Sequence, residues 1–179
     1  MASSHGAVPQ RTIVHRGEAA IRRLGEFGLT PEALMFAARE AEIARNACTA
    51  HHVPTHPGSR AWAEGNRALA DRLVPIGFTY KVESNVPLLF HATDPIAITM
   101  SAGDKFTGTD GTPSTKNDRG PASSRMIEVG LDLFAGTPFE PKVRSGLYDL
   151  WYLLWYRFGD VIRCELSQPR HVVGGDVTD

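Results

Sequence analysis

The sequence predicts an α+β fold in which an N-terminal pair of helices packs on an antiparallel sheet of about five strands. Three observations support this prediction. Apolar residues recur at helical spacing up to residue 74, apolar and polar residues alternate from residue 78, and an aromatic-rich stretch near the C-terminus precedes a second alternation. With 42% hydrophobic and 22% charged residues, the 179-residue chain can build one core without metals or disulfides. We expect one domain over residues 17–168, between a disordered arm (1–16) and an irregular tail (169–179).

The first long helix is expected at about residues 30–47. Thr30 is a good N-cap, and Pro31 suits the first helical turn. Leu29 and Leu34 have the spacing of a hydrophobic staple. These signals together fix where the helix begins.

The second long helix is expected at about residues 57–74. The segment HHVPTHPG before it contains two prolines that break the first helix, and Pro75 ends the second. A shorter helix is expected over residues 18–26. The two long helices, joined by a short turn, form an antiparallel pair that needs a further layer to bury its apolar side.

Strands are expected wherever the period changes to two. In FTYKVE, Phe78, Tyr80 and Val82 face one way, and the residues between them face the other way. Turns at Ser84-Asn85 and at Thr93-Asp94-Pro95 make the first three strands an antiparallel meander. The expected strands are, in order, about residues 78–83, 86–92, 96–102, 126–134, 148–158 and 161–167. A short helix capped by Ser124 remains an alternative for the fourth.

The aromatic stretch before Gly159-Asp160 fits two templates. As a helix, it carries an unbroken apolar stripe from Leu147 to Phe158. As a hairpin, it places Trp155 opposite Cys164 and Leu153 opposite Leu166. The two patterns fit almost equally well, but two tryptophans and three tyrosines within nine residues favour the strand.

Charge and cysteine content exclude several classes of protein. The net charge is −1, so no overall positive field draws the chain onto nucleic acid, and direct nucleic-acid binding is not expected. Cys48 and Cys164 lie far apart, as suits a reducing compartment. There is no signal peptide and no apolar run of about 18 residues, so a cytoplasmic protein without membrane contact is expected.

The segment SAGDKFTGTDGTPSTKNDRGPASSR, residues 101–125, is the first candidate binding site. Gly103 and Gly108 have the glycine spacing of a phosphate-binding Walker loop, but Thr109-Asp110 follows where lysine and a hydroxyl residue belong. The aspartates of the segment lack the spacing of a calcium loop. A looser anion or contact site remains open, and so does a plain mobile connection. The residues of that site are Lys105, Thr107, Thr115, Lys116 and Arg119.

A cysteine and three histidines between the long helices could offer metal ligands. Cys48, His51, His52 and His56 lie within nine residues, but Pro54 keeps His52 and His56 from sharing a regular helix face. The run from Cys48 through His51 to His56 could supply three ligands, but no second cluster nearby in the sequence supplies a fourth, so these side chains are expected to decorate a turn. We expect no metal and no cofactor. No G-x-S-x-G elbow occurs, and nothing near Cys48 would orient a histidine as its base, so no catalytic residues are assigned.

The aromatic strand is the second candidate binding site. Its tyrosines, Tyr148, Tyr152 and Tyr156, alternate with Trp151 and Trp155 and therefore face the opposite side of the sheet. Core packing on both faces is the favoured interpretation, because large aromatics dominate core energetics. If the tyrosine face is exposed instead, it is a contact surface, since tyrosine is enriched in binding hot spots.

Several segments together resemble a known group of proteins. From about residue 28 to residue 179 the chain is similar to uncharacterised small accessory proteins of phages and bacterial integrative elements. The segments that carry this resemblance are GLTPEAL, AAREAEIARNAC, PGSRAWAEGNRAL, SAGDKFTGTDGTPSTKNDRGP, LDLF and YLLWYRFGDVIRCELSQP. The resemblance implies a mobile-element context without a defined activity, and it favours the hairpin because the ELS segment looks like the second of two strands.

The favoured hypothesis is a non-catalytic binding protein of a mobile element. It would dock onto a host protein or ribonucleoprotein complex and inhibit a host defence such as CRISPR interference. A first alternative is an enzyme or ligand-binding domain that holds a phosphorylated small molecule in the 101–125 segment. A second is an accessory protein that binds nucleic acid through the arginines of the first 25 residues. The oligomeric state does not follow from the sequence.

Overall fold

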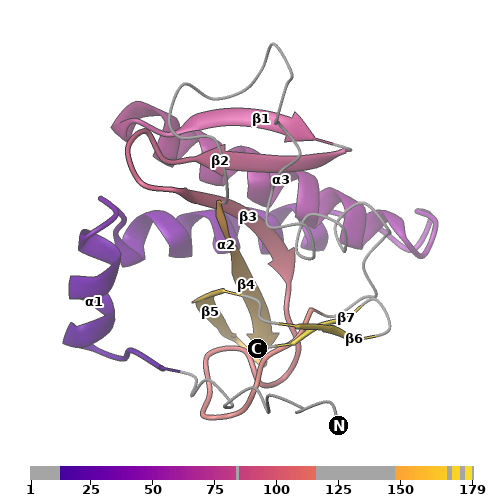
Figure 1. Cartoon of the computed structure of the whole chain (residues 1–179). Coiled ribbons are helices and arrows are strands. Elements are labelled where there is room, and N and C mark those ends of the chain that lie inside the picture. Colours follow the sequence, from indigo (N-terminus) through magenta and orange to yellow (C-terminus); the bar gives the residue numbers. More distant parts are fainter. Residues whose placement is uncertain (1–12, 84, 116–147, 169–170, 174–175, 179) are drawn as a thin grey trace, which may run out of the picture.

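The helices precede the sheet in the chain and lie on one of its faces (Figure 1). The structure, a computed structural model, describes residues 13–83, 85–115, 148–168, 171–173 and 176–178. The helices of this part are α1 (Glu18–Gly25), α2 (Pro31–Asn46), α3 (His56–Leu73) and the short 3-10 helix η1 (Val74–Ile76). Its strands are β1 (Thr79–Glu83), β2 (Val86–Phe90), β3 (Ile96–Ala102), β4 (Asp149–Phe158), β5 (Val161–Ser167), β6 (His171–Val173) and β7 (Asp176–Thr178).

The five-stranded sheet follows the order of the chain, β1-β2-β3-β4-β5. This arrangement confirms the α+β class, with one correction, because β3 and β4 are parallel and not antiparallel. Ile96 at the start of β3 pairs with Asp149 at the start of β4. The chain leaves β3 at one end of the sheet and begins β4 at the other, and a parallel pair always needs such a long crossover connection.

The β4–β5 hairpin has the register that the sequence predicted. Trp155 pairs with Cys164 and Leu153 with Leu166, so the helical alternative for this stretch is wrong. A two-residue turn at Gly159-Asp160 joins the strands, with Gly159 at φ 59°. That left-handed conformation is one that glycine adopts without strain, and it suits a tight hairpin.

The two long helices begin and end within a residue of the expected positions. The hydroxyl of Thr30 accepts a hydrogen bond from the Ala33 N–H at 3.2 Å, which confirms the predicted N-cap of α2. The antiparallel pair packs closely where the chain has glycine. A Cβ built on Gly65 of α3 would lie 3.0 Å from the Cβ of Ala41 in α2 and 2.8 Å from the sulfur of Met100 in β3.

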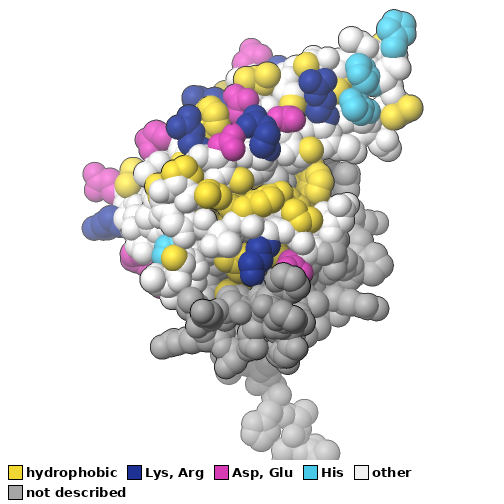
Figure 2. All heavy atoms as spheres, turned by 90° about the horizontal axis from the view of Figure 1, so that it is seen from above, with side chains coloured by type: hydrophobic (Ala, Val, Ile, Leu, Met, Phe, Trp, Pro, Cys, Tyr) yellow, Lys and Arg dark blue, Asp and Glu magenta, His cyan; other side chains and the backbone are white. Residues whose placement is uncertain are grey.

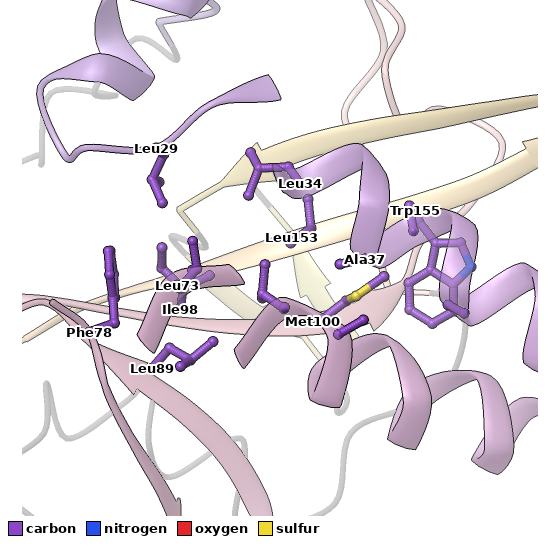
Figure 3. Packing of buried hydrophobic residues seen from close by; sticks show 14 of the residues in the cluster. Leu29, Leu34, Ala37, Leu73, Phe78, Leu89, Ile98, Met100, Leu153 and Trp155 are labelled. Atoms are coloured by element: carbon purple, nitrogen blue, oxygen red, sulfur yellow. The ribbon is translucent and has the colours of Figure 1, made fainter. Parts of the chain in front are cut away.

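The main core lies between the helices and the sheet (Figure 3). It joins leucines and alanines of α2 and α3 to Phe78, to Ile98 and Met100 of β3, and to Leu153 and Trp155 of β4. A second cluster of buried residues lies on the opposite face of the sheet and includes Leu88, Phe90, Leu150, Tyr152 and Leu154. Both faces of the sheet therefore carry buried apolar residues.

Two buried polar side chains tie the helices to the sheet. Asn66 of α3 accepts a hydrogen bond from the Met100 N–H at 3.0 Å and donates to the Met100 carbonyl at 3.1 Å. The indole N–H of Trp155 donates to the carboxylate of Glu42 in α2 at 3.2 Å. Both side chains are buried, and these hydrogen bonds offset the cost of removing their polar groups from water.

One expectation at the ends of the chain needs correction, and others fall on residues outside the described part. The tail from residue 169 was expected to be irregular, but β6 and β7 pair as a short antiparallel ladder in which Val172 lies opposite Val177. The strand expected at 126–134 and most of the arm at 1–16 lie outside the described residues. Arg16, at the end of that expected arm, contacts the loop after β3.

Candidate functional site

The described part of the loop after β3, residues 103–115, folds back on itself. Gly103 and Thr115 form an antiparallel bridge, and the Asp104 N–H donates to the Ser114 carbonyl at 3.0 Å. The Gly103 N–H donates to the Trp155 carbonyl at 2.8 Å, which holds the base of the loop against β4. This segment, which we call the β3 loop, therefore continues the hydrogen bonding of the sheet beyond the end of β3.

Short polar side chains organise the interior of the β3 loop. The carboxylate of Asp104 accepts from the Phe106 N–H at 2.9 Å and from the Ser114 hydroxyl at 3.2 Å. The Thr109 hydroxyl donates to the Phe106 carbonyl at 2.7 Å and accepts from the Gly111 N–H at 3.1 Å. Asp, Ser and Thr favour such local hydrogen bonds, so the composition that suggested a mobile connection also builds ordered turns.

The β3 loop packs on the outer face of β5, the face away from the helices. The Gly108 N–H donates to the Glu165 carboxylate at 2.8 Å, and Glu165 also accepts from the Ser167 hydroxyl at 2.6 Å. A Cβ built on Gly108 would lie 3.1 Å from the Cβ of Arg163, so glycine permits this close approach. Arg16, which precedes α1, also forms an ion pair with Asp110 of the loop.

Only one of the predicted loop residues is exposed within the described chain. Lys105 is exposed, and its ammonium lies 5.0 Å from the centre of the Phe106 ring. Thr107 is 0% exposed and Thr115 is also buried, so their expected place on an open contact surface is wrong. Thr107 is buried because its hydroxyl occupies the space that a side chain at Gly103 would fill. Lys116 and Arg119 lie outside the described residues.

The predicted tyrosine face is largely core. Tyr152 is 1% exposed and belongs to the second cluster, so it is not a surface contact. Tyr148 is half-buried with its ring edge-on to Phe90, at a centroid distance of 4.9 Å. Tyr156 is also half-buried, and it lies opposite Arg163 in the β4–β5 pairing. Core packing on both faces, the favoured interpretation, therefore holds for Tyr152, whereas Tyr148 and Tyr156, at the two ends of the face, are partly exposed.

The tip of the β4–β5 hairpin carries exposed apolar residues that the sequence analysis missed. Phe158 and Val161 pair across the turn and remain 59% and 60% exposed. The guanidinium of Arg163 lies 4.6 Å from the centre of the Phe158 ring. The signal in the sequence was the Gly159-Asp160 turn itself, because large apolar residues that flank a hairpin turn extend beyond the core.

The hairpin tip is held in place. Arg157 donates to the Gly159 carbonyl at 2.8 Å and to the side chain of Asn46, at the end of α2, at 3.3 Å. The β3 loop meets this tip where Gly108 contacts Arg163. We call the combined region the loop–hairpin surface and define it by six residues: Lys105, Phe106, Tyr156, Phe158, Val161 and Arg163.

The histidines between α2 and α3 lie at one end of the helical layer (Figure 2). The rings of His52 and His56 stack with centroids 4.6 Å apart, and the Thr49 N–H donates to Nδ1 of His52 at 3.0 Å. The thiol of Cys48 donates to the Ala44 carbonyl at 3.6 Å. Within the residues that the structure describes, no three His, Cys, Asp or Glu side chains are placed to hold a metal ion.

Cys164 is partly buried against the main core. It packs beside the main cluster, and its sulfur lies 4.0 Å from that of Met35 in α2. Burial raises the pKa of the Cys164 thiol to about 12, and nearby Arg39 opposes this only in part. A thiol that stays protonated is a poor nucleophile, so Cys164 has no place in the candidate site.

Comparisons with models of protein families, with curated proteins and with solved structures find no match for this chain. Among the described helices, none combines the length and the apolar character needed to cross a membrane.

Proposed function

We propose that this protein is a non-catalytic binding protein that docks onto another protein through the loop–hairpin surface. The observation that carries the proposal is the exposure of Phe158 and Val161 on a braced hairpin tip. Large apolar side chains at a rigid, exposed position lose little conformational freedom when a partner covers them. Phe158 and Val161 could therefore contribute to an interface at a small cost in conformational entropy.

The chemistry of the surface indicates the kind of partner. Arg163 lies over Phe158, and Lys105 lies beside Phe106, so each exposed ring has a cation next to it. Aromatic residues and arginine are the residue types enriched in binding hot spots. The partner that suits this surface has an apolar pocket for Phe158, rimmed by carboxylates that complement Arg163 and Lys105.

Some of the residues on which the two alternatives depend are buried or paired. Of the residues expected to form a phosphate site in the loop, Thr107 and Thr115 are buried, and Lys116 and Arg119 lie outside the described residues. Nucleic-acid binding needed the N-terminal arginines, of which Arg16 is paired with Asp110 and Arg23 with Glu26. A host complex as the partner, and inhibition of a host defence as the effect, rest on the resemblance to mobile-element proteins.

The test is a pull-down from a bacterial lysate, read by mass spectrometry, that compares two variants with the natural chain. The double variant Phe158→Ser/Arg163→Glu removes the ring and reverses the charge, so we expect it to lose the captured protein. Ile43→Ser is the matched control, because Ile43 is an exposed apolar residue on α2, outside the surface. It should retain the partner.

A purified partner permits a quantitative check. Isothermal titration calorimetry should show the double variant binding at least about 30-fold more weakly, which corresponds to the loss of a hot spot of about 2 kcal/mol. Equal capture of both variants would exclude the loop–hairpin surface. If no protein is retained above a tag-only control, the binding function itself is contradicted. Thermal-shift screens with nucleotides would then test the ligand-binding alternative.

A further inference from the structure

The β1 edge of the sheet is a second exposed surface, at the far side of the sheet from β5. In the strand order, β1 has one hydrogen-bonded neighbour among the described strands, β2. Tyr80 and Val82 are 46% and 54% exposed, and Val74 and Ile76 of η1 are also exposed apolar residues. Figure 2 looks onto the side where β1 lies in Figure 1 and shows hydrophobic side chains gathered in the middle of this face.

Within the described part of the chain, β1 has backbone N–H and C=O groups that do not face β2 and with which another strand could pair. Glu83 pairs with Val86 across a two-residue connection, and in such tight hairpins this flanking pair exchanges both hydrogen bonds. Every second residue from Glu83 therefore directs its N–H and C=O groups toward β2. Tyr80 and Val82 occupy the intervening positions and direct theirs away from the sheet. These outward groups, beside apolar side chains, form an edge on which a strand can add.

We infer that a second copy of this chain binds at the β1 edge, with the two β1 strands antiparallel and Val82 opposite Val82 of the other copy. The charges of β1 support a second copy as the occupant. In this register Lys81 lies opposite Glu83 of the other copy, and the two-fold axis repeats this pair. The strand is thus complementary to itself.

Neighbouring registers are less favourable. Side chains alternate between the two faces of a strand, so only some shifts of one β1 strand along the other keep Tyr80 and Val82 of both copies on the same face. Centring the pair on Lys81 sets two lysines opposite each other, and like charges directly opposite are destabilising. Lysine on an edge strand commonly prevents pairing with another strand. When Val82 lies on the two-fold axis, however, Lys81 lies opposite Glu83 of the other copy and not opposite another lysine, so the two side chains attract each other.

The contact is small, and this determines how it must be measured. One five-residue strand with a few apolar side chains matches weak, transient interfaces, which bury less than about 1,200 Å². We therefore expect a dimer that forms in the micromolar to millimolar range. It is independent of the loop–hairpin surface, which lies over β4 and β5.

The test is sedimentation velocity of the full chain and of four variants from about 10 µM to about 1 mM, the range of weak association. The natural chain should show a reversible monomer–dimer equilibrium. Glu83→Lys should weaken it about tenfold, because two symmetry-related pairs become repulsive. The double variant Lys81→Glu/Glu83→Lys should restore association to within about threefold of the natural chain, because both pairs are attractive again. Val82→Lys should abolish association.

Val161→Lys is the matched control, because Val161 is an exposed valine of β5 with no part in this edge. It should leave the dimer unchanged, whereas Val82→Lys should still capture the protein partner proposed above. Amide hydrogen exchange of the natural chain gives a readout without variants. The N–H groups of Tyr80 and Val82 should become more protected as the concentration rises. A chain that is monomeric throughout, or a dimer indifferent to Glu83→Lys, would overturn the inference.

Discussion

Cys164 shows how the environment of one residue decides its chemistry. On sequence alone it is one of two free cysteines, with no indication of reactivity. In the structure it faces α2 from β5, where burial raises the pKa of its thiol to about 12. The group thus binds its proton more tightly in the folded chain than in the unfolded chain, whose thiol has a pKa of about 8.5.

This shift predicts slow labelling of Cys164. In a Cys48→Ser variant, the thiolate fraction at pH 9 should be at least about a hundredfold smaller in the folded chain than in the unfolded chain, so alkylation should slow accordingly. The sign of the linkage follows from the same pKa. Between about pH 8.5 and pH 12 the folded chain holds more protons, so the free energy of unfolding should fall as pH rises. Cys164→Ala should remove that part of the pH slope. Fast labelling of the native chain would contradict the buried position.

The residues of the candidate site were only partly predictable, and the reason is physical. Alternation correctly separated Tyr152 from Trp151 by face, whereas the burial of the second face was inferred from the size of its aromatic side chains and not from the pattern. Thr107 looked available because threonine is common in open loops, yet its burial depends on the absence of a side chain at Gly103. Such packing depends on how the folded chain is arranged in three dimensions, so it leaves no recognisable pattern in the sequence.

At the scale of elements, signals that act within a few residues were reliable. The Thr30 cap and the Gly159-Asp160 turn set the start of α2 and the register of the hairpin, because each depends on neighbouring backbone groups only. The parallel pairing of β3 with β4 had no comparable signal. Period-two alternation specifies which face of a strand is buried but not which strand lies beside it.

α2, α3 and β3 approach one another closely at Gly65, so stability should be sensitive to the size of the side chain at this position. Gly65→Ala should destabilise the fold by about 1–3 kcal/mol, because its Cβ would crowd Ala41 and Met100 by more than the gain in helix propensity offsets. Gly58→Ala, in the same helix, is the control. A Cβ there meets no atom within 4 Å, so it should leave stability unchanged or raise it by about 0.4–1 kcal/mol.

Urea unfolding of both variants beside the natural chain measures this difference. The ordering of the two midpoints is the informative quantity, since both changes add one methyl group to α3. If Gly65→Ala is at least as stable as Gly58→Ala, the two helices do not approach each other and β3 as closely as the structure has them.

At the scale of the whole molecule, one core connects the two halves of the chain. The main cluster contains residues of α2 and α3, of β2 and β3, and of β4, with Ile162, Cys164 and Leu166 of β5 packed against it. The β4–β5 hairpin therefore shares its hydrophobic core with the N-terminal half of the chain. The parallel β3–β4 pair and the Trp155–Glu42 hydrogen bond join the same two parts.

This connectivity predicts a single cooperative unfolding transition. Trp151 and Trp155 lie on β4, so fluorescence reports mainly on the hairpin, whereas far-UV circular dichroism reports mainly on the long helices. Because both share one core, the two signals should give the same urea midpoint and the same slope, as two-state unfolding requires. A Trp62→Phe variant removes the helical tryptophan and makes the comparison cleaner. A fluorescence transition at clearly lower urea would mean that the hairpin leaves the helices first, and the loop–hairpin surface would then lack the rigid support on which its proposed role depends.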